Sequence, residues 1–247
     1  MSLITVERIK LFSTRSPWWC MVLALALADG FVTLGFIFAP DDTVWKTTDT
    51  QGTYIFGLMV MMVMAALAVT TEYRFGTIRT SFLSVPKRLP ILISKALVAA
   101  TLAGVVGLVT SFGAFGLGKV LVKDSSGLQL STGADWRAVA GVGLVYFLAA
   151  LIAVAIGILV RQSAGAIAIA ICWPLLLEGI GLAIPKVGDF IADWGPFSRA
   201  SWFITGDPKA PDAADALMSP GWSLVYFAGW AVGLLVIALA VAKKRDA

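Results

Sequence analysis

The sequence contains no histidine, only two cysteines and few charged residues. Without histidine there is no imidazole base for a serine or cysteine hydrolase and no histidine ligand for a metal, so such sites are excluded. Cys20 and Cys172 each lie inside an apolar stretch, where we expect them to pack as small apolar side chains. Charged residues make up 14% of the chain, against roughly 25% in a soluble domain. A soluble protein is therefore not expected.

The sequence also lacks the G-x-x-x-x-G-K-[ST] loop that cradles the phosphates of ATP. No arrangement of nucleophile and base is visible, so we expect that the chain itself is not an enzyme and carries no cofactor. Its basic residues are not interleaved with aromatic residues in a way that suits nucleic-acid bases. We therefore expect no nucleic-acid partner.

Long apolar stretches dominate what is present. Apolar residues make up 59% of the chain and the mean hydropathy is +0.88. Segments of about 20 apolar residues are long enough to cross a bilayer as helices. We predict an all-α membrane protein whose residues 1–247 form a single transmembrane domain. The six predicted spans cover about residues 18–38, 53–71, 89–118, 138–160, 164–184 and 222–242.

The distribution of lysine and arginine predicts the orientation of these spans. With both termini in the cytoplasm, twelve of the 19 basic residues lie on the cytoplasmic side. Cytoplasmic loops are enriched in lysine and arginine, so this topology is favoured for a plasma-membrane protein. The twelve are Arg8, Lys10, Arg15, Arg74, Arg79, Lys87, Arg88, Lys95, Arg161, Lys243, Lys244 and Arg245.

The first 17 residues are predicted to form an interfacial helix. They are basic, they place Val6, Ile9 and Phe12 three residues apart, and Pro17 marks the turn into the bilayer. A cleaved signal peptide is the alternative, but the apolar stretch continues to residue 38, which is spanning length.

The long outer loop, residues 185–221, carries Val187, Ile191 and Trp194 at helical spacing, and proline breaks the pattern after Gly195. This indicates one or two short helices dipping into the outer leaflet, with an ordinary surface loop as the alternative. In the preceding span, Pro174 removes a backbone donor and is expected to kink the helix.

Residues 72–84, between the second and third spans, combine basic charge with an apolar periodicity. In a helix, Phe75, Ile78 and Phe82 would form one stripe that the chain itself has no means to bury. Such a stripe lies either on lipid or in a groove of another protein, and the pattern leaves both open.

Two carboxylates interrupt the apolar stretches, Asp29 in the first span and Glu178 in the fifth. A charge at the centre of a membrane helix costs roughly 2.5 to 3.5 kcal/mol on insertion scales, so each should face protein or water. Either could lie on a substrate pathway or bind a proton. Alternatively, each is a protonated or hydrogen-bonded carboxyl that holds two helices together, and Glu178, nearer the outer surface, could equally be solvated from that side.

The stretch after the second span resembles the permease subunits of ABC-2-type exporters, and in particular their small actinobacterial and Gram-positive members. The resemblance rests on an acidic residue followed by Tyr-Arg-x-Gly-Thr-Ile-Arg, then Pro-Lys-Arg, at Glu72 to Arg79 and Pro86 to Arg88. The basic N-terminal helix, six spans, long outer loop and basic tail are similar as well.

The resemblance implies that the segment is a coupling helix that docks on a separate ABC ATPase subunit. It assigns this role to Glu72, Arg74, Phe75, Gly76, Ile78, Arg79 and Phe82. It further implies two ATPase subunits, which bind ATP and Mg²⁺, and a second permease copy or a paralogue. The protein would then lie in a bacterial plasma membrane, in contact with lipid.

The resulting hypothesis is a permease that exports a hydrophobic or amphipathic small molecule, or a lipid-like compound, with drug or antibiotic efflux as the leading case. An ion-coupled secondary transporter that uses Asp29 or Glu178 is one alternative. A non-exporting membrane module partnered with an ATPase is another.

Overall fold

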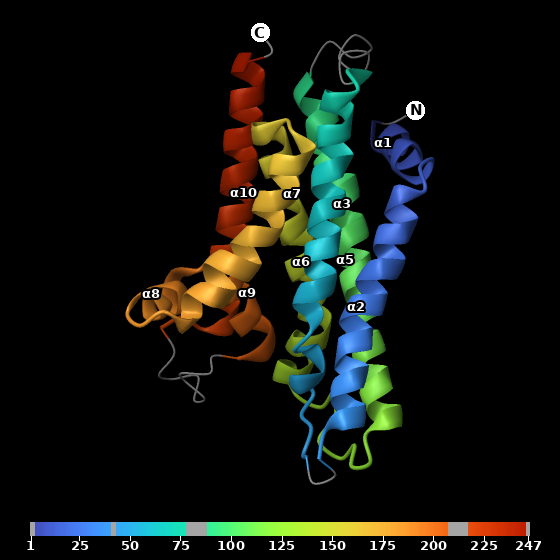
Figure 1. Cartoon of the computed structure of the whole chain (residues 1–247), viewed down its shortest axis with the longest axis vertical. Helices are drawn as coiled ribbons and strands as arrows, with labels where there is room; N and C mark the ends of the chain where they lie inside the picture. The colour runs from blue at the N-terminus through green and yellow to red at the C-terminus, as the bar shows by residue number, and fades with distance from the viewer. Residues whose placement is uncertain (1–2, 41–42, 78–87, 207–216, 246–247) are drawn as a thin grey trace.

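A computed structural model describes residues 3–40, 43–77, 88–206 and 217–245 of the chain. The described residues are almost entirely helical and contain no strand. Six helices among them are long and apolar enough to cross a membrane, which confirms the predicted all-α, six-span architecture. Both ends of the chain lie at one end of the bundle (Figure 1).

The helices follow one another with few long connections. The first half of the chain forms α1 (Leu3–Phe12), α2 (Ser16–Phe38), a 3₁₀ turn η1 (Asp49–Gln51), α3 (Tyr54–Arg74) and α5 (Arg88–Leu121). The second half forms α6 (Gly133–Val160), α7 (Ser163–Cys172), η2 (Trp173–Ile180), η3 (Gly181–Ala183), α8 (Val187–Trp194), α9 (Pro196–Thr205) and α10 (Pro220–Arg245).

Helix α6 is the centre of the bundle. The most apolar stretch of α6 is 78% buried, whereas the most apolar stretch of α10 is 17% buried. Helix α6 packs against α3, α5, α7, α9 and α10. Glycines on both α5 and α6 allow a close approach between these two helices. A Cβ atom added at Gly107 would lie 2.6 Å from Cγ of Tyr146, and one added at Gly143 would lie 2.5 Å from Cγ of Leu108. Glycine therefore lets α5 and α6 touch where a larger side chain would separate them.

The fifth span changes its helical pitch halfway. Helix α7 ends at Cys172, and the next eight residues, Trp173–Ile180, form a π-helix with Pro174 at its start. Proline lacks the N–H that would continue the α-helical ladder, so the break occurs where the sequence predicts it. A 3₁₀ turn, η3, completes the span.

Two short helices, α8 and α9, follow this span in the predicted outer loop and lie beside the bundle (Figure 1). Helix α9 packs against α6 and α10 and buries Phe197, Arg199, Phe203 and Ile204. The buried guanidinium of Arg199 donates from Nε to the carbonyl of Asp193 at 2.6 Å and lies 4.4 Å from the ring centre of Trp202. Helical structure was therefore the right interpretation of this part of the loop.

Candidate site at the end of α3

The segment predicted as a helix over residues 72–84 begins differently in the structure. Helix α3 continues through Glu72 and Tyr73 and ends at Arg74, so these residues are its last turn. Gly76 then has a φ of +72°. The prediction that Gly76 lies within a helix is wrong, because this left-handed backbone is the conformation in which glycine ends a helix.

The exposed end of α3 presents an aromatic residue. The side chain of Phe75 is 71% exposed, and the guanidinium carbon of Arg74 lies 5.6 Å from its ring centre. The other predicted docking residues, Ile78, Arg79 and Phe82, lie outside the described part of the chain. Phe75 and Arg74 are thus available to a partner, whereas Glu72 faces the protein.

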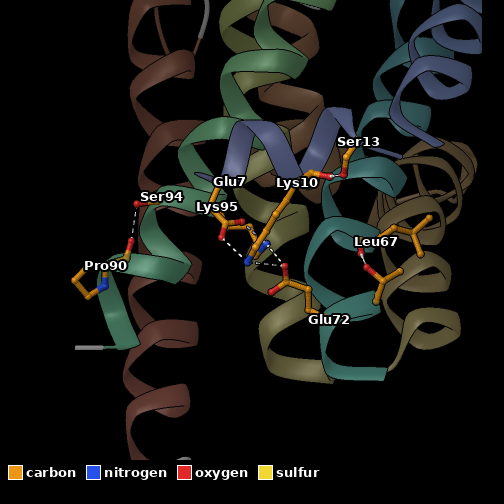
Figure 2. Close-up of polar contacts among 9 residues, drawn as sticks. Glu7, Lys10, Ser13, Leu67, Glu72, Pro90, Ser94 and Lys95 are labelled. Carbon is orange, nitrogen blue, oxygen red and sulfur yellow. Dashed lines mark hydrogen bonds and ion pairs between the residues drawn. The ribbon is translucent and has the colours of Figure 1, made fainter. Parts of the chain in front are cut away.

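Glu72 belongs to a buried cluster of ion pairs that joins three helices (Figure 2). At its centre, Nζ of Lys95 on α5 lies 2.8 Å from Oε1 of Glu72 and 2.5 Å from Oε2 of Glu7 on α1. Lys10, also on α1, lies 3.2 Å from Oε1 of Glu7 and 3.5 Å from Oε1 of Glu72. We call these four residues the inner ion cluster.

Burial makes the inner ion cluster a rigid connection rather than a surface contact. The side chains of Lys95 and Glu7 are only 6% and 5% exposed, that of Glu72 is 14% exposed, and only Lys10 is half-exposed. Removing one partner of a buried pair leaves an uncompensated charge and typically costs about 3 to 5 kcal/mol. The cluster therefore ties α1 and α5 to the last turn of α3.

The pairing of Glu7 with Lys95 was not predicted from the sequence, where Glu7 looked like a surface residue and Lys95 like one more cytoplasmic cation. One signal was present. Lys95 is a lone cation within an otherwise apolar stretch of α5, and such a residue needs a carboxylate partner.

Residues of the α6–α7 link hold the opposite side of the same turn of α3. The guanidinium carbon of Arg161 lies 4.9 Å from the ring centre of Tyr73, and the hydroxyl of Ser163 donates to that of Thr70 at 3.1 Å. Arg161 also ends α6 in a left-handed conformation, with φ of +57°. The end of α3 is consequently fixed to α1, α5, α6 and α7.

A cavity of about 360 Å³ lies next to the inner ion cluster, between α1, α3 and α5. The charged residues of the cluster form part of its wall. Its other lining residues are Leu11, Ser13, Thr14, Ala68, Thr71, Thr77, Val98 and Ala99.

Glu178 makes the contacts of a structural residue. Its Oε2 accepts hydrogen bonds from the backbone N–H of Ser198 at 2.7 Å and from the hydroxyl of Ser198 at 3.0 Å, so it caps the first turn of α9. A Cβ at Gly195 would lie 2.5 Å from this oxygen, so glycine is needed for the carboxylate to reach the helix. These contacts favour the interpretation in which Glu178 joins two helices.

Asp29 lies in α2 and faces α5, where a Cβ at Gly113 would be 3.0 Å from its Oδ2. Nearby polar residues include Gln51, whose amide donates to the carbonyl of Ser111 at 3.1 Å, and Thr53, whose hydroxyl donates to the carbonyl of Ala28 at 2.7 Å. The structure does not bring Asp29 together with Glu178, and neither lies in the inner ion cluster. A pathway role for Asp29 stays a prediction.

The described residues contain no group of three or more His, Cys, Asp or Glu side chains that could hold a metal ion. In a comparison with known families, the family described as ABC-2 family transporter protein matches residues 3–175. No curated protein and no solved structure shows a significant match. The matched region contains α1, α3, α5 and the whole inner ion cluster.

Proposed function

Because the chain belongs to the ABC-2 transporter family and is the permease of an ABC transporter, we propose that it exports an apolar or amphipathic compound with a separate ATPase subunit. The family match supports the transporter class and a multi-pass membrane location. The direction of transport, the substrate class and the stoichiometry of two permeases and two ATPases are parts of the proposal.

The observation that carries the proposal is the exposed end of α3. Phe75 offers an apolar side chain to a partner, next to the Gly76 turn, while the residues directly before it are fixed in the protein by buried contacts. A docking element needs this combination, because a flexible attachment would absorb the movement of the ATPase instead of passing it on. Glu72 and Tyr73 are, in this proposal, residues that transmit movement rather than residues that touch the ATPase.

The distribution of charge supports the orientation that docking requires. Helix α10 ends in the basic run Lys243, Lys244 and Arg245, at the same end of the bundle as α1 and the end of α3 (Figure 1). The positive-inside tendency would place this end in the cytoplasm, where an ATPase and its ATP and Mg²⁺ are found. We propose that both termini are cytoplasmic and that the membrane is a bacterial plasma membrane.

The docking role can be tested by removing the apolar contact. Full burial of a phenylalanine side chain is worth about 1.5 to 3 kcal/mol, so Phe75→Asp should weaken binding of the ATPase roughly 10- to 100-fold, and Ile78→Asp should add to the effect. The measurement is co-purification of a candidate ABC ATPase co-expressed with the permease, with substrate-stimulated ATP hydrolysis as a second readout.

A matched control is Val44→Asp, which changes another exposed apolar residue, 69% exposed, in the loop before η1. It should leave ATPase binding unchanged. A normal complex with full substrate-stimulated ATPase activity in the Phe75→Asp, Ile78→Asp variant would refute the docking role.

The alternatives differ in what they require of the chain alone. An ion-coupled secondary transporter would need a titrating carboxylate on its pathway, and the capping contacts of Glu178 leave Asp29 for that role. Flux driven by a proton gradient in vesicles that contain only this chain would favour that class. A non-exporting module would bind the ATPase but move no compound across the membrane.

A further inference from the structure

The cavity beside the inner ion cluster has a polar part and an apolar part. Glu72 and Lys95 line the cavity at the same depth in the bundle. Ala68 lies four residues before Glu72, and Val98 and Ala99 lie three and four residues after Lys95. Each of these is about one helical turn, or roughly 5 Å, further towards the interior of the predicted spans. The cavity is thus shaped for a molecule with a polar head and an apolar continuation.

Among the described residues that line the cavity, the charges balance one another. Glu7 and Glu72 supply two negative charges, and Lys10 and Lys95 supply two positive charges. A ligand head with a net charge would leave one charge uncompensated in a partly buried site, which is unfavourable. A zwitterionic head group would keep the balance.

One buried oxygen of a lining residue indicates which chemical group would complement the site. Oε1 of Glu72 accepts from Lys95, but Oε2 is buried and has no hydrogen-bond partner among the described residues. A buried carboxylate oxygen is costly to leave unpaired, so its natural complement is a group that donates N–H bonds and carries positive charge. Lys10, the half-exposed cation of the cluster, is suited to an accompanying phosphate.

We propose that this cavity binds the head group of an inner-leaflet phospholipid with a primary ammonium, such as phosphatidylethanolamine. The ammonium donates to Oε2 of Glu72, the phosphate faces Lys10, and the first part of the glycerol and acyl region lies against Ala68, Val98 and Ala99. The cavity volume of about 360 Å³ is in the range of small-ligand sites. The bound lipid would fill the space between α1 and the spans.

The proposal predicts discrimination between two lipids that differ only at nitrogen. Phosphatidylcholine has the same phosphate and the same charge balance, but its quaternary nitrogen has no N–H to donate. The full chain, purified in detergent, is incubated with equal amounts of phosphatidylethanolamine, phosphatidylcholine and phosphatidylglycerol carrying identical acyl chains. Native mass spectrometry should show roughly tenfold more phosphatidylethanolamine bound than phosphatidylcholine. Equal retention of the two would overturn the proposal.

Variants locate the binding in this cavity. Ala68→Phe fills the apolar part and should abolish the preference, whereas Ala26→Phe, at an exposed position on α2, should preserve it. Glu72→Gln removes the charged acceptor while Glu7 remains paired with Lys95, and it should bring the ratio of the two lipids close to one. If Ala68→Phe does not yield monodisperse protein, the Glu72→Gln ratio decides: an unchanged preference there overturns the proposal.

A soluble competitor separates a lipid from a free phosphate ester. Phosphoethanolamine carries the same head group without the apolar part, so at the concentration of the lipid it should leave the bound lipid in place. Displacement at that concentration would show that the apolar part of the cavity is not used and would overturn the lipid assignment. None of these measurements involves an ATPase or nucleotide, so their outcome is independent of the proposed docking role.

Discussion

Replacing Lys95 by methionine tests whether the inner ion cluster is a structural connection. The substitution keeps an unbranched side chain of similar length and removes the charge between Glu7 and Glu72. Two carboxylates that are 5% and 14% exposed then lose their principal partner. We expect the folded state to be destabilised and α1 to separate from α5.

The expected loss of stability in the Lys95→Met variant depends on the ion pairs that remain in the cluster. Breaking a buried ion pair costs about 3 to 5 kcal/mol, but Lys10 still lies 3.2 Å from Glu7 and 3.5 Å from Glu72, so the loss should fall near the lower limit, about 3 kcal/mol. At about 2 to 4 °C per kcal/mol for a chain of this size, the melting temperature should fall by roughly 6 to 12 °C. Thermal unfolding of the purified protein in detergent measures this shift.

Three controls separate charge from packing. Lys95→Arg retains the charge and should lose less stability. Lys119→Met removes an exposed lysine at the far end of the same helix and should have almost no effect. Combining Lys95→Met with Glu7→Gln and Glu72→Gln removes the two buried carboxylate charges, leaves only the half-exposed Lys10 charged, and should recover much of the loss. If Lys95→Met melts within about 2 °C of the wild type, or the triple variant melts no higher than the single one, the reasoning about buried charge is wrong.

Three further substitutions test other contacts. Gly107→Ala should cost about 1 to 3 kcal/mol because its Cβ would meet Tyr146, whereas Gly116→Ala, with nothing within 4 Å, should cost nothing; equal melting temperatures would contradict the α5–α6 packing. Glu178→Leu should cost about 1 to 3 kcal/mol more than Glu178→Gln, since only glutamine keeps an oxygen for the N–H of Ser198, and equal stability would argue against the α9 cap. Gly76→Ala should cost about 1 kcal/mol at its positive φ and weaken capture of the ATPase in the co-purification assay; unchanged capture would show that the turn does not position Phe75.

The sequence was sufficient for features that depend on hydropathy or on local chemistry. Six apolar stretches predicted six spans, Pro174 marked the change of pitch in the fifth, and the period of Val187, Ile191 and Trp194 predicted helix α8. Each of these signals acts within one helix, where backbone hydrogen bonding and side-chain spacing decide the outcome.

Features that depend on contacts between distant segments could not be predicted from the sequence in this way. Glu7 and Lys95 are 88 residues apart, and a basic N-terminal stretch gives no sign that its one acid turns inwards. At Gly76 the apolar period of Phe75, Ile78 and Phe82 suggested a continuous helix, but that pattern is silent about the backbone dihedral of the glycine between them. For Glu178 the sequence left a pathway role, a helix-joining role and solvation from the outer side open, and only the fold shows the start of α9 against it.

The central position of α6 has a consequence for the route of a transported compound. Among the described helices five pack against it, and its residues 149–158 are all buried. A passage through the interior of one chain would have to pull these helices off α6 and expose closely fitted glycine and alanine surfaces. For the proposed export, a route along the perimeter of the bundle would leave these contacts in place, and lipid or another subunit would form its facing wall.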